Sequence, residues 1–167
     1  MKRIVLLLLV AASMGGFTLS AQTVNSLENG KYSLSVGDVT LTVDASRGGK
    51  IVSYKYKDTE ILSQTRMPNS FGSTFWTSPQ SEWNWPPVPE YDTKPFNAEV
   101  TDGKLVLTGE KSKRFGYKVR KEFVADTKDN AIVITYTLVN ESGETRKVAP
   151  WEISRVPNGG ILFFDAK

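Results

Sequence analysis

The feature of this sequence that most constrains its fold is a series of short runs in which apolar and polar residues alternate. Successive side chains of a β-strand point to opposite faces, so a period of two predicts strands. The clearest run spans residues 131–140. Its apolar side chains fall on one face at Ile132, Ile134, Tyr136 and Leu138, and on the other at Val133 and Val139. Because both faces carry apolar residues, we expect a central strand that is covered on both sides.

Comparable runs, separated by turn residues, occur at 31–36, 39–44, 50–57, 60–63, 98–101, 104–110, 115–125, 145–149 and 151–156. Gly37-Asp38 and Asp102-Gly103 each separate two runs by two residues, which is typical of β-hairpins because these residue types tolerate positive φ. Beyond the first residues, no run of helical length carries an amphipathic stripe. The 167 residues suffice for one domain with a sizeable core. We therefore predict an all-β fold, an antiparallel β-sandwich.

The last apolar run, residues 161–164, ends three residues before Lys167. An apolar strand at a sheet edge invites association with other chains, so we expect it to be paired. Two interpretations are open. Either the run pairs back into the sheet, or a partner chain or further C-terminal sequence completes the sheet and these residues are the front part of a longer sandwich.

Residues 1–21 are predicted to be a secretory signal peptide, because a basic start is followed by an apolar run and then by small residues. The apolar run is too short to serve as a permanent membrane anchor. We expect cleavage after Ala21, with cleavage after Ser20 as the alternative. The sandwich domain then comprises residues 22–167, and the protein is expected in the periplasm or outside the cell, with no membrane association after cleavage.

The chain has neither cysteine nor histidine. Disulfides and a lipid on an N-terminal cysteine are therefore excluded, and so are the commonest metal ligand and the usual general base near neutral pH. No spacing of acidic residues is typical of a calcium loop, so we expect no metal and no cofactor. The formal charge of +3 becomes 3 − 2 = +1 once the two basic residues of the signal are removed. This charge gives no indication of nucleic-acid binding.

Residues 71–96 combine aromatic residues and prolines without a helical or strand period. They hold three of the four tryptophans and five of the eight prolines of the chain. Long aperiodic connections in compact domains are usually functional or disordered, and a high aromatic content disfavours disorder. We predict an ordered loop, neither strand nor helix, that lies across a rigid scaffold and serves a ligand. The alternative is that its tryptophans merely close the open end of a small core.

Three segments resemble the galactose mutarotase-like superfamily, which includes the aldose 1-epimerases. Residues 47–53 (RGGKIVS) resemble a strand entry of that fold, residues 130–140 (NAIVITYTLVN) its central strand, and residues 75–83 (FWTSPQSEW) a loop of an exported branch. The resemblance covers most of residues 30–164 and implies the N-terminal half of a supersandwich, hence an incomplete one. It implies that the domain binds or isomerises aldoses. The histidine acid that the family carries near residues 151–153 is missing, and its general-base glutamate lies beyond residue 167.

Mutarotation needs a general base and a general acid, and the nearby carboxylates are Glu82, Glu90, Asp92 and Glu152. Glu152 is the candidate catalytic residue, because apolar contact with the adjacent Trp151 would raise its pKa. The alternative is an ordinary carboxylate at the surface or at a sheet edge. Three positions separate Glu152 from Arg155, so the two side chains are expected on opposite faces of a regular strand.

Binding a sugar requires flat apolar surfaces for its C–H face and amide or guanidinium groups for its hydroxyls. The candidate binding residues are Trp76, Gln80, Trp83, Asn84, Trp85, Trp151, Arg155 and Arg47. For the two arginines an ordinary surface role is an equal alternative. Three functions stay open: a mutarotase-like carbohydrate-active domain, a non-catalytic carbohydrate-binding module, and a surface sandwich whose aromatic loop meets another protein.

Overall fold

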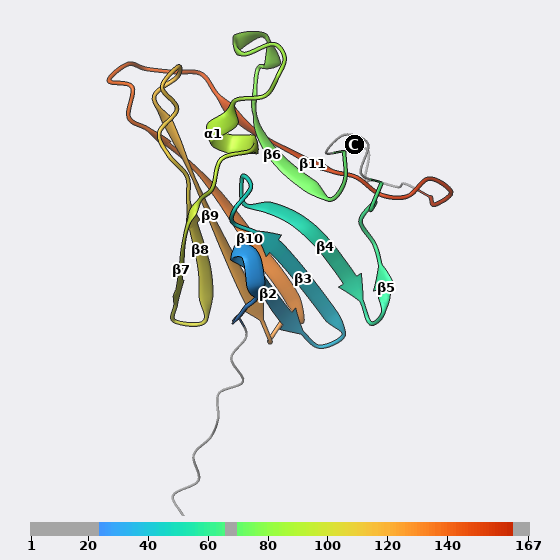
Figure 1. The fold of residues 1–167 in the computed structure, drawn as a ribbon. Helices are drawn as coiled ribbons and strands as arrows, with labels where there is room; N and C mark the ends of the chain where they lie inside the picture. The colour runs from blue at the N-terminus through green and yellow to red at the C-terminus, as the bar shows by residue number, and fades with distance from the viewer. Residues whose placement is uncertain (1–23, 66–69, 162–167) are drawn as a thin grey trace, which may run out of the picture.

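The alternating runs form two antiparallel sheets that pack face to face in the computed structural model (Figure 1). The structure describes residues 24–65 and 70–161. The predicted signal peptide and all but the first residue of the run 161–164 lie outside these residues. Within them the chain is an all-β sandwich, as the sequence predicts. The additional strands expected to complete the sheet stay a prediction.

The larger sheet has the order β1-β2-β3-β4-β6-β11, with β5 paired to β4. Its strands are β1 (Val24–Ser26), β2 (Lys31–Val36), β3 (Val39–Asp44), β4 (Lys50–Tyr56), β5 (Thr59–Glu60), β6 (Ser73–Ser78) and β11 (Ala149–Ser154). The smaller sheet has the order β10-β9-β8-β7. Its strands are β7 (Asn97–Thr101), β8 (Lys104–Thr108), β9 (Tyr117–Asp126) and β10 (Ala131–Asn140). The helical turns among the described residues are η1 (Glu28–Gly30), η3 (Gln80–Glu82) and α1 (Pro89–Asp92).

Both predicted hairpins are confirmed. Val36 pairs with Val39 across the Gly37-Asp38 turn, and Thr101 pairs with Lys104 across Asp102-Gly103. Asp102 and Gly103 adopt φ values of 49° and 73°, the left-handed conformation that this turn chemistry favours. The turn residues therefore determine the registers of the β2–β3 and β7–β8 pairs.

The core lies between the sheets, where the inward face of β9 contributes Tyr117, Val119 and Phe123, all fully buried. The same face contains Lys121, which is 1 % exposed. Its ammonium Nζ donates hydrogen bonds of 2.7 and 3.1 Å to the carbonyls of Gly48 and Gly49. These carbonyls belong to the turn between β3 and β4, so Lys121 links the smaller sheet to the larger one.

The expectation of a central strand at residues 131–140 is wrong: the strand exists as β10, but it is the terminal strand of the smaller sheet and pairs with β9 alone among the described residues. Val133 on its outer face is 46 % exposed. β-Branched residues are favoured in strands for their backbone preference as well as for burial, so valines on both faces did not require two covering layers.

The predicted loop at residues 71–96 is also partly wrong, because it contains strand β6 and the short helix α1. Phe75 of β6 stacks on Tyr136 of β10 at 4.8 Å between ring centroids, inside the sandwich. Trp76 points to the opposite face and is 9 % exposed, because residues 79–96 fold back over it. A strand buried on both faces has no alternation, which is why a period-two search misses it.

Smaller differences occur at strand ends. Residues 145–148 are irregular and β11 begins at Ala149, while β5 covers only Thr59–Glu60 of the region around the predicted run 60–63. β11 includes Pro150, which suits an edge strand because proline lacks a backbone donor.

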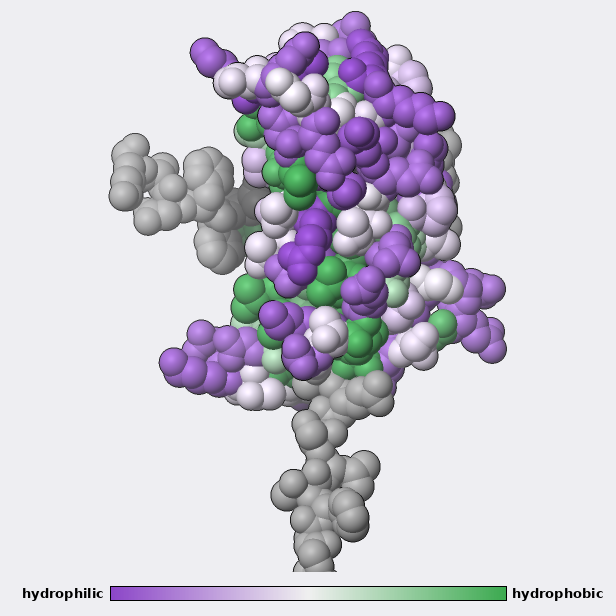
Figure 2. Space-filling view, turned by 90° about the vertical axis from the view of Figure 1, so that its left-hand side faces the viewer, coloured by the Kyte–Doolittle hydropathy of each residue, from purple (hydrophilic) through white to green (hydrophobic). Residues whose placement is uncertain are grey.

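Figure 2 shows the face on the side of β7, where hydrophilic side chains dominate the upper part and hydrophobic ones appear among them below. This mixed character is that of ordinary solvent-exposed surface. In the part of the chain that the structure covers, no helix has the length and apolar character needed to cross a membrane.

Candidate functional site

Trp76 is the centre of a cluster of four indoles on the outer face of the larger sheet. Its ring centroid lies 5.8 Å from Trp83, 5.8 Å from Trp85 and 5.7 Å from Trp151, with interplanar angles of 67°, 86° and 81°. These edge-to-face contacts are the favoured geometry for aromatic pairs. Trp151 reaches the cluster because β11 pairs with β6 in a register that places it opposite Trp76. The cluster therefore joins β6, β11 and the loop that follows β6.

The four indoles differ in exposure. Trp83 is 4 % exposed, and its Nε1 donates a 2.9 Å hydrogen bond to the carbonyl of Thr77. Trp85, by contrast, is 68 % exposed. The alternative interpretation, in which tryptophan closes the core, therefore describes Trp83, whereas Trp85 is accessible to a ligand.

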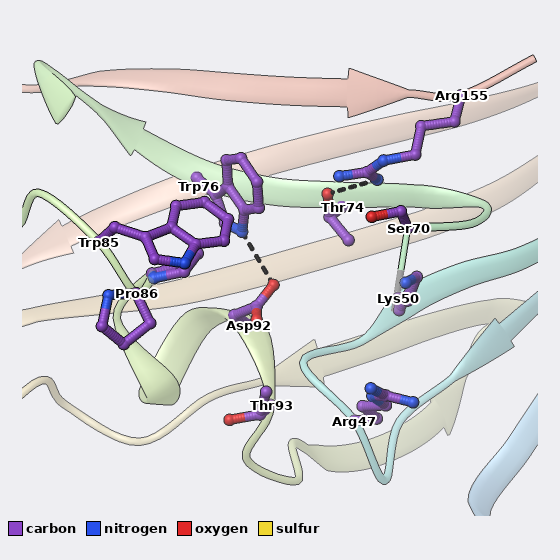
Figure 3. Close-up of a pocket in the computed structure, with 11 residues that line it drawn as sticks. Arg47, Lys50, Ser70, Thr74, Trp76, Trp85, Pro86, Asp92, Thr93 and Arg155 are labelled. Atoms are coloured by element: carbon purple, nitrogen blue, oxygen red, sulfur yellow. Dashed lines mark hydrogen bonds between the residues drawn. The ribbon is translucent and has the colours of Figure 1, made fainter. Parts of the chain in front are cut away.

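Beside this cluster lies a cavity of about 320 Å³ between the outer face of the sheet and α1. Figure 3 shows its lining, which consists of Arg47, Lys50, Ser70, Thr74, Trp76, Trp85, Pro86, Pro87, Asp92, Thr93 and Arg155. The volume falls in the range of about 300–1,000 Å³ that is typical of small-molecule sites. We define this space as the aromatic cavity.

Arg47 reaches the aromatic cavity from the turn between β3 and β4. Gly48 in that turn has a φ of +63°, and a Cβ there would lie 2.4 Å from the carbonyl oxygen of Asp92. The Gly48 amide donates a 2.7 Å hydrogen bond to the carbonyl of Lys94. Only glycine permits so close an approach of the turn to α1 in this conformation, and that approach places Arg47 next to the helix.

Arg155, just after β11, is held by its backbone. Its amide donates to the carbonyl of Gly72 at 3.1 Å, and its carbonyl accepts from the amide of Ser63 at 2.7 Å. The guanidinium donates a 3.1 Å hydrogen bond to the Thr74 hydroxyl and lies 5.8 Å from the Trp76 ring centroid. Arg155 therefore lines the aromatic cavity from the side opposite Trp85 (Figure 3).

Asp92 at the end of α1 accepts a 2.8 Å hydrogen bond from Trp76 Nε1. It is the one carboxylate among the described residues that line the aromatic cavity, which also include the cationic side chains of Arg47, Lys50 and Arg155. Lys50 is 3 % exposed, and its Nζ lies 3.9 Å from the centroid of the Phe71 ring. The site thus combines an aromatic wall, a cationic wall and one carboxylate.

The aromatic cavity brings together four of the residues predicted from the sequence: Arg47, Trp76, Trp85 and Arg155. Gln80 and Trp151 instead line a separate shallow depression. Its other lining residues are Ser78, Pro79, Ser81, Ala149 and Pro150. Asn84 is exposed on the loop, and Trp83 is buried beneath it. The fold of the loop turns Gln80, Trp83 and Asn84 away from the cavity, and Trp151 on β11 lies outside its lining.

Glu152 lies on the other face of β11. Its Oε1 accepts a hydrogen bond from the Ser73 hydroxyl, while Arg155 donates to Thr74, the next residue of β6. The two side chains therefore occupy opposite faces, as expected. Glu152 is exposed as a residue of an edge strand, yet its carboxyl group lies against the sheet close to the Tyr136 hydroxyl, and this local burial raises its pKa. Glu152 is accordingly separated from the aromatic cavity by the strand.

Sequence reasoning did not select Lys50 and Thr74 as site residues, and it named Asp92 only as one of four nearby carboxylates. Lys50 follows the Gly48-Gly49 pair, and Asp92 lies within the aromatic segment, so both had a signal in the sequence. Thr74 had none, because its place in β6 was not predicted.

No group of three or more metal-ligating side chains occurs within residues 24–65 and 70–161. Comparison with known proteins adds no further constraint: no family model, curated protein or solved structure matches this chain.

Proposed function

We propose that residues 22–167 form a mutarotase-like, carbohydrate-binding domain of an exported protein, and that a saccharide occupies the aromatic cavity. The observation that carries this proposal is the 68 % exposure of Trp85 at a cavity of about 320 Å³. An indole offers a large flat apolar surface and one hydrogen-bond donor, which suits the C–H face and the hydroxyls of a sugar.

The polar lining supports the same proposal. Arg47 and Arg155 can donate to sugar hydroxyls, and Thr93 can both donate and accept. A concave, partly apolar site with a few convergent polar groups is the usual form of a small-molecule site. Trp85 also lines a second depression with Pro86–Glu90 and Arg114, so an oligosaccharide could continue past the indole.

Binding is better supported than turnover. Mutarotation needs a base and an acid at the sugar ring, and Asp92 is the one carboxylate among the described residues that line the aromatic cavity. Its Oδ1 already accepts the hydrogen bond from Trp76. Glu152 faces the other side of the sheet. We therefore expect the chain not to accelerate anomer exchange of free aldoses, and an acceleration that Glu152→Gln abolishes would restore the epimerase hypothesis.

The binding experiment is calorimetric titration of the chain with a panel of mono- and oligosaccharides, comparing Trp85→Ala with the parent. We expect Trp85→Ala to lower the affinity about tenfold or more, since the stacking surface is lost. Because the indole is largely exposed and its recorded ring contact is with Trp76, the free energy of unfolding should change by only about 1 kcal/mol. Tyr56→Ala, which removes a 51 % exposed ring from β4, serves as the matched control.

An unchanged affinity in Trp85→Ala, or a loss equal to that in Tyr56→Ala, would contradict the proposal. Trp83→Ala is not a useful binding test. It removes a buried ring, and such a truncation costs about 3–5 kcal/mol, so any loss of binding would reflect loss of structure.

The family and export parts of the proposal rest on sequence. Residues 47–53, 75–83 and 130–140 carry the family resemblance, and an all-β sandwich is compatible with it, although sandwiches serve many unrelated functions. Export rests on residues 1–21. The N-terminal sequence of protein recovered from the periplasm or medium tests it, and a chain that retains its first residues in the cytoplasm would contradict it.

A further inference from the structure

The described lining of the aromatic cavity carries a net positive charge. Arg47, Lys50 and Arg155 face a single carboxylate, Asp92, which gives a formal charge of 3 − 1 = +2. The chain without its signal has a formal charge of only 3 − 2 = +1. The positive charge of the cavity is therefore a local concentration and not the consequence of a basic protein.

Within residues 24–65 and 70–161, the two arginines of the cavity form no ion pair. None of the ion pairs recorded within the described residues involves Arg47 or Arg155. Arg155 donates to the uncharged hydroxyl of Thr74, and the Asp92 carboxylate accepts from the uncharged indole of Trp76. Among the described residues, therefore, neither guanidinium is paired with a carboxylate within 4.0 Å, although the charge of Arg155 also acts on Glu152.

Lys50 adds a third cationic group to the lining of the aromatic cavity. It is 3 % exposed, and its Nζ lies 3.9 Å from the centroid of the Phe71 ring. Cationic groups that line a concave site with low-dielectric walls favour an anionic ligand there.

The charges are also arranged directionally. Figure 3 shows Trp85, Trp76 and Pro86 on one side of the cavity and Arg155, Lys50 and Arg47 on the other. A pyranose stacked on Trp85 would direct substituents of its ring toward the cationic side. Guanidinium groups pair with carboxylate and sulfate through charge-assisted hydrogen bonds, which are stronger than those to hydroxyls.

We propose that the ligand of the aromatic cavity is an anionic saccharide, one whose sugar carries a carboxylate or sulfate group. This inference rests on the proposed carbohydrate-binding function and names the class of sugar. The acid group lies toward Arg47, Lys50 and Arg155, and the sugar ring lies on Trp85.

The test is calorimetric titration with methyl glycosides of gluco, galacto and manno configuration, each with a hydroxymethyl, carboxylate or 6-sulfate at the C6 position. We expect at least one acidic glycoside to bind about tenfold or more tightly than its neutral counterpart. This preference should shrink as sodium chloride is added, because salt screens partly exposed charges. The carboxylate and sulfate series distinguish the two anions.

Two arginine variants locate the effect. Arg155→Gln and Arg47→Gln should each weaken binding of the acidic glycoside about tenfold more than binding of its neutral counterpart, because a charge-assisted hydrogen bond is lost only with the acid. Arg146→Gln, which removes an arginine paired with Glu144 outside the cavity, should retain the preference. Because Arg155→Gln also loses the bond to Thr74, its thermal midpoint is measured, and Arg47→Gln gives an independent result.

The outcomes separate the two proposals. If every neutral glycoside binds as tightly as its acidic counterparts, the anionic-ligand inference is overturned and the carbohydrate-binding proposal stands. If no glycoside of either kind binds, both are overturned. If Arg146→Gln reduces the acid preference as much as the cavity variants, the preference arises from overall charge, and the assignment to this cavity is wrong.

Discussion

The indole Nε1 of Trp76 donates a 2.8 Å hydrogen bond to the carboxylate of Asp92, and this bond joins strand β6 to helix α1 across the aromatic cavity (Figure 3). Trp76 is 9 % exposed, so its N–H has little access to water. Water therefore does not readily replace this bond between strand β6 and helix α1.

Replacing Asp92 separates the roles of its hydrogen bond and its charge. Asp92→Ala leaves the indole N–H of Trp76 unpaired, which should cost about 1–3 kcal/mol in the free energy of unfolding. Asp92→Asn keeps an acceptor oxygen and should cost less. Urea unfolding of the two variants measures the difference. Equal stabilities of Asp92→Ala and the parent would show that the bond does not hold α1 in place.

Gly48→Ala should destabilise the protein more than Gly143→Ala. Both glycines have positive φ, at +63° and +78°, so both substitutions carry backbone strain of about 1–3 kcal/mol. A Cβ at position 48 would also lie 2.4 Å from the carbonyl oxygen of Asp92, whereas nothing lies within 4 Å of one at position 143. Thermal midpoints of the two variants test this. A smaller loss in Gly48→Ala would mean that the turn and α1 separate without cost.

Lys121 should make stability depend on pH in the alkaline range. Burial lowers the pKa of its ammonium from 10.5 to about 8, against the opposing effect of the Glu152 and Asp92 charges. The folded chain therefore binds this proton less tightly than the unfolded chain, and the free energy of unfolding should rise as the pH increases from about 8 toward 10.5. The full shift corresponds to about 3 kcal/mol.

Lys121→Met is the control, because it retains an unbranched side chain of similar length without a titrating group. The difference in unfolding free energy between parent and variant should grow in favour of the parent between about pH 8 and 9.5. Burial raises the pKa of Tyr91 and Tyr136, which has the opposite effect at higher pH and sets the upper limit of the measurement. If the difference in unfolding free energy between parent and Lys121→Met does not change with pH, the lowered pKa of Lys121 is contradicted.

The raised pKa of Glu152 predicts the opposite pH dependence of stability in the acidic range. Local burial raises the pKa of its carboxyl group above 4.5, although hydrogen bonds from Ser73 and Tyr136 oppose the effect. The folded chain then holds the proton more tightly, so this contribution to stability is present below pH 4.5 and is lost as the pH rises through the folded pKa. Relative to the parent, Glu152→Gln should become more stable between acidic and neutral pH.

The same variant should leave saccharide affinity unchanged, because Glu152 faces away from the aromatic cavity. Urea unfolding at several pH values and titration at neutral pH give both results. If Glu152→Gln instead loses stability relative to the parent as the pH rises, or clearly loses saccharide affinity, this placement of Glu152 is wrong.

Local physical chemistry was enough to predict several parts of this fold from the sequence. A period of two gave correct strands at β2, β3, β9 and β10, and the Asp102-Gly103 pair gave a hairpin because its conformation depends on those two residues alone. For the site, the aromatic segment and the glycine-rich turn were both identified from the sequence, and they provide Trp76, Trp85 and Arg47 of the aromatic cavity.

Strand pairing between distant segments and the burial of individual side chains were decided by the tertiary structure, because local sequence patterns do not contain this information. The pairing of β11 with β6 joins residues more than seventy positions apart and places Trp151 opposite Trp76, while turning Glu152 to the other face. The same fold buries Trp83 and leaves Trp85 exposed, although both belong to one short loop. The physical reason is that burial on a strand or loop depends on which surface covers it, and here that surface comes from distant parts of the chain.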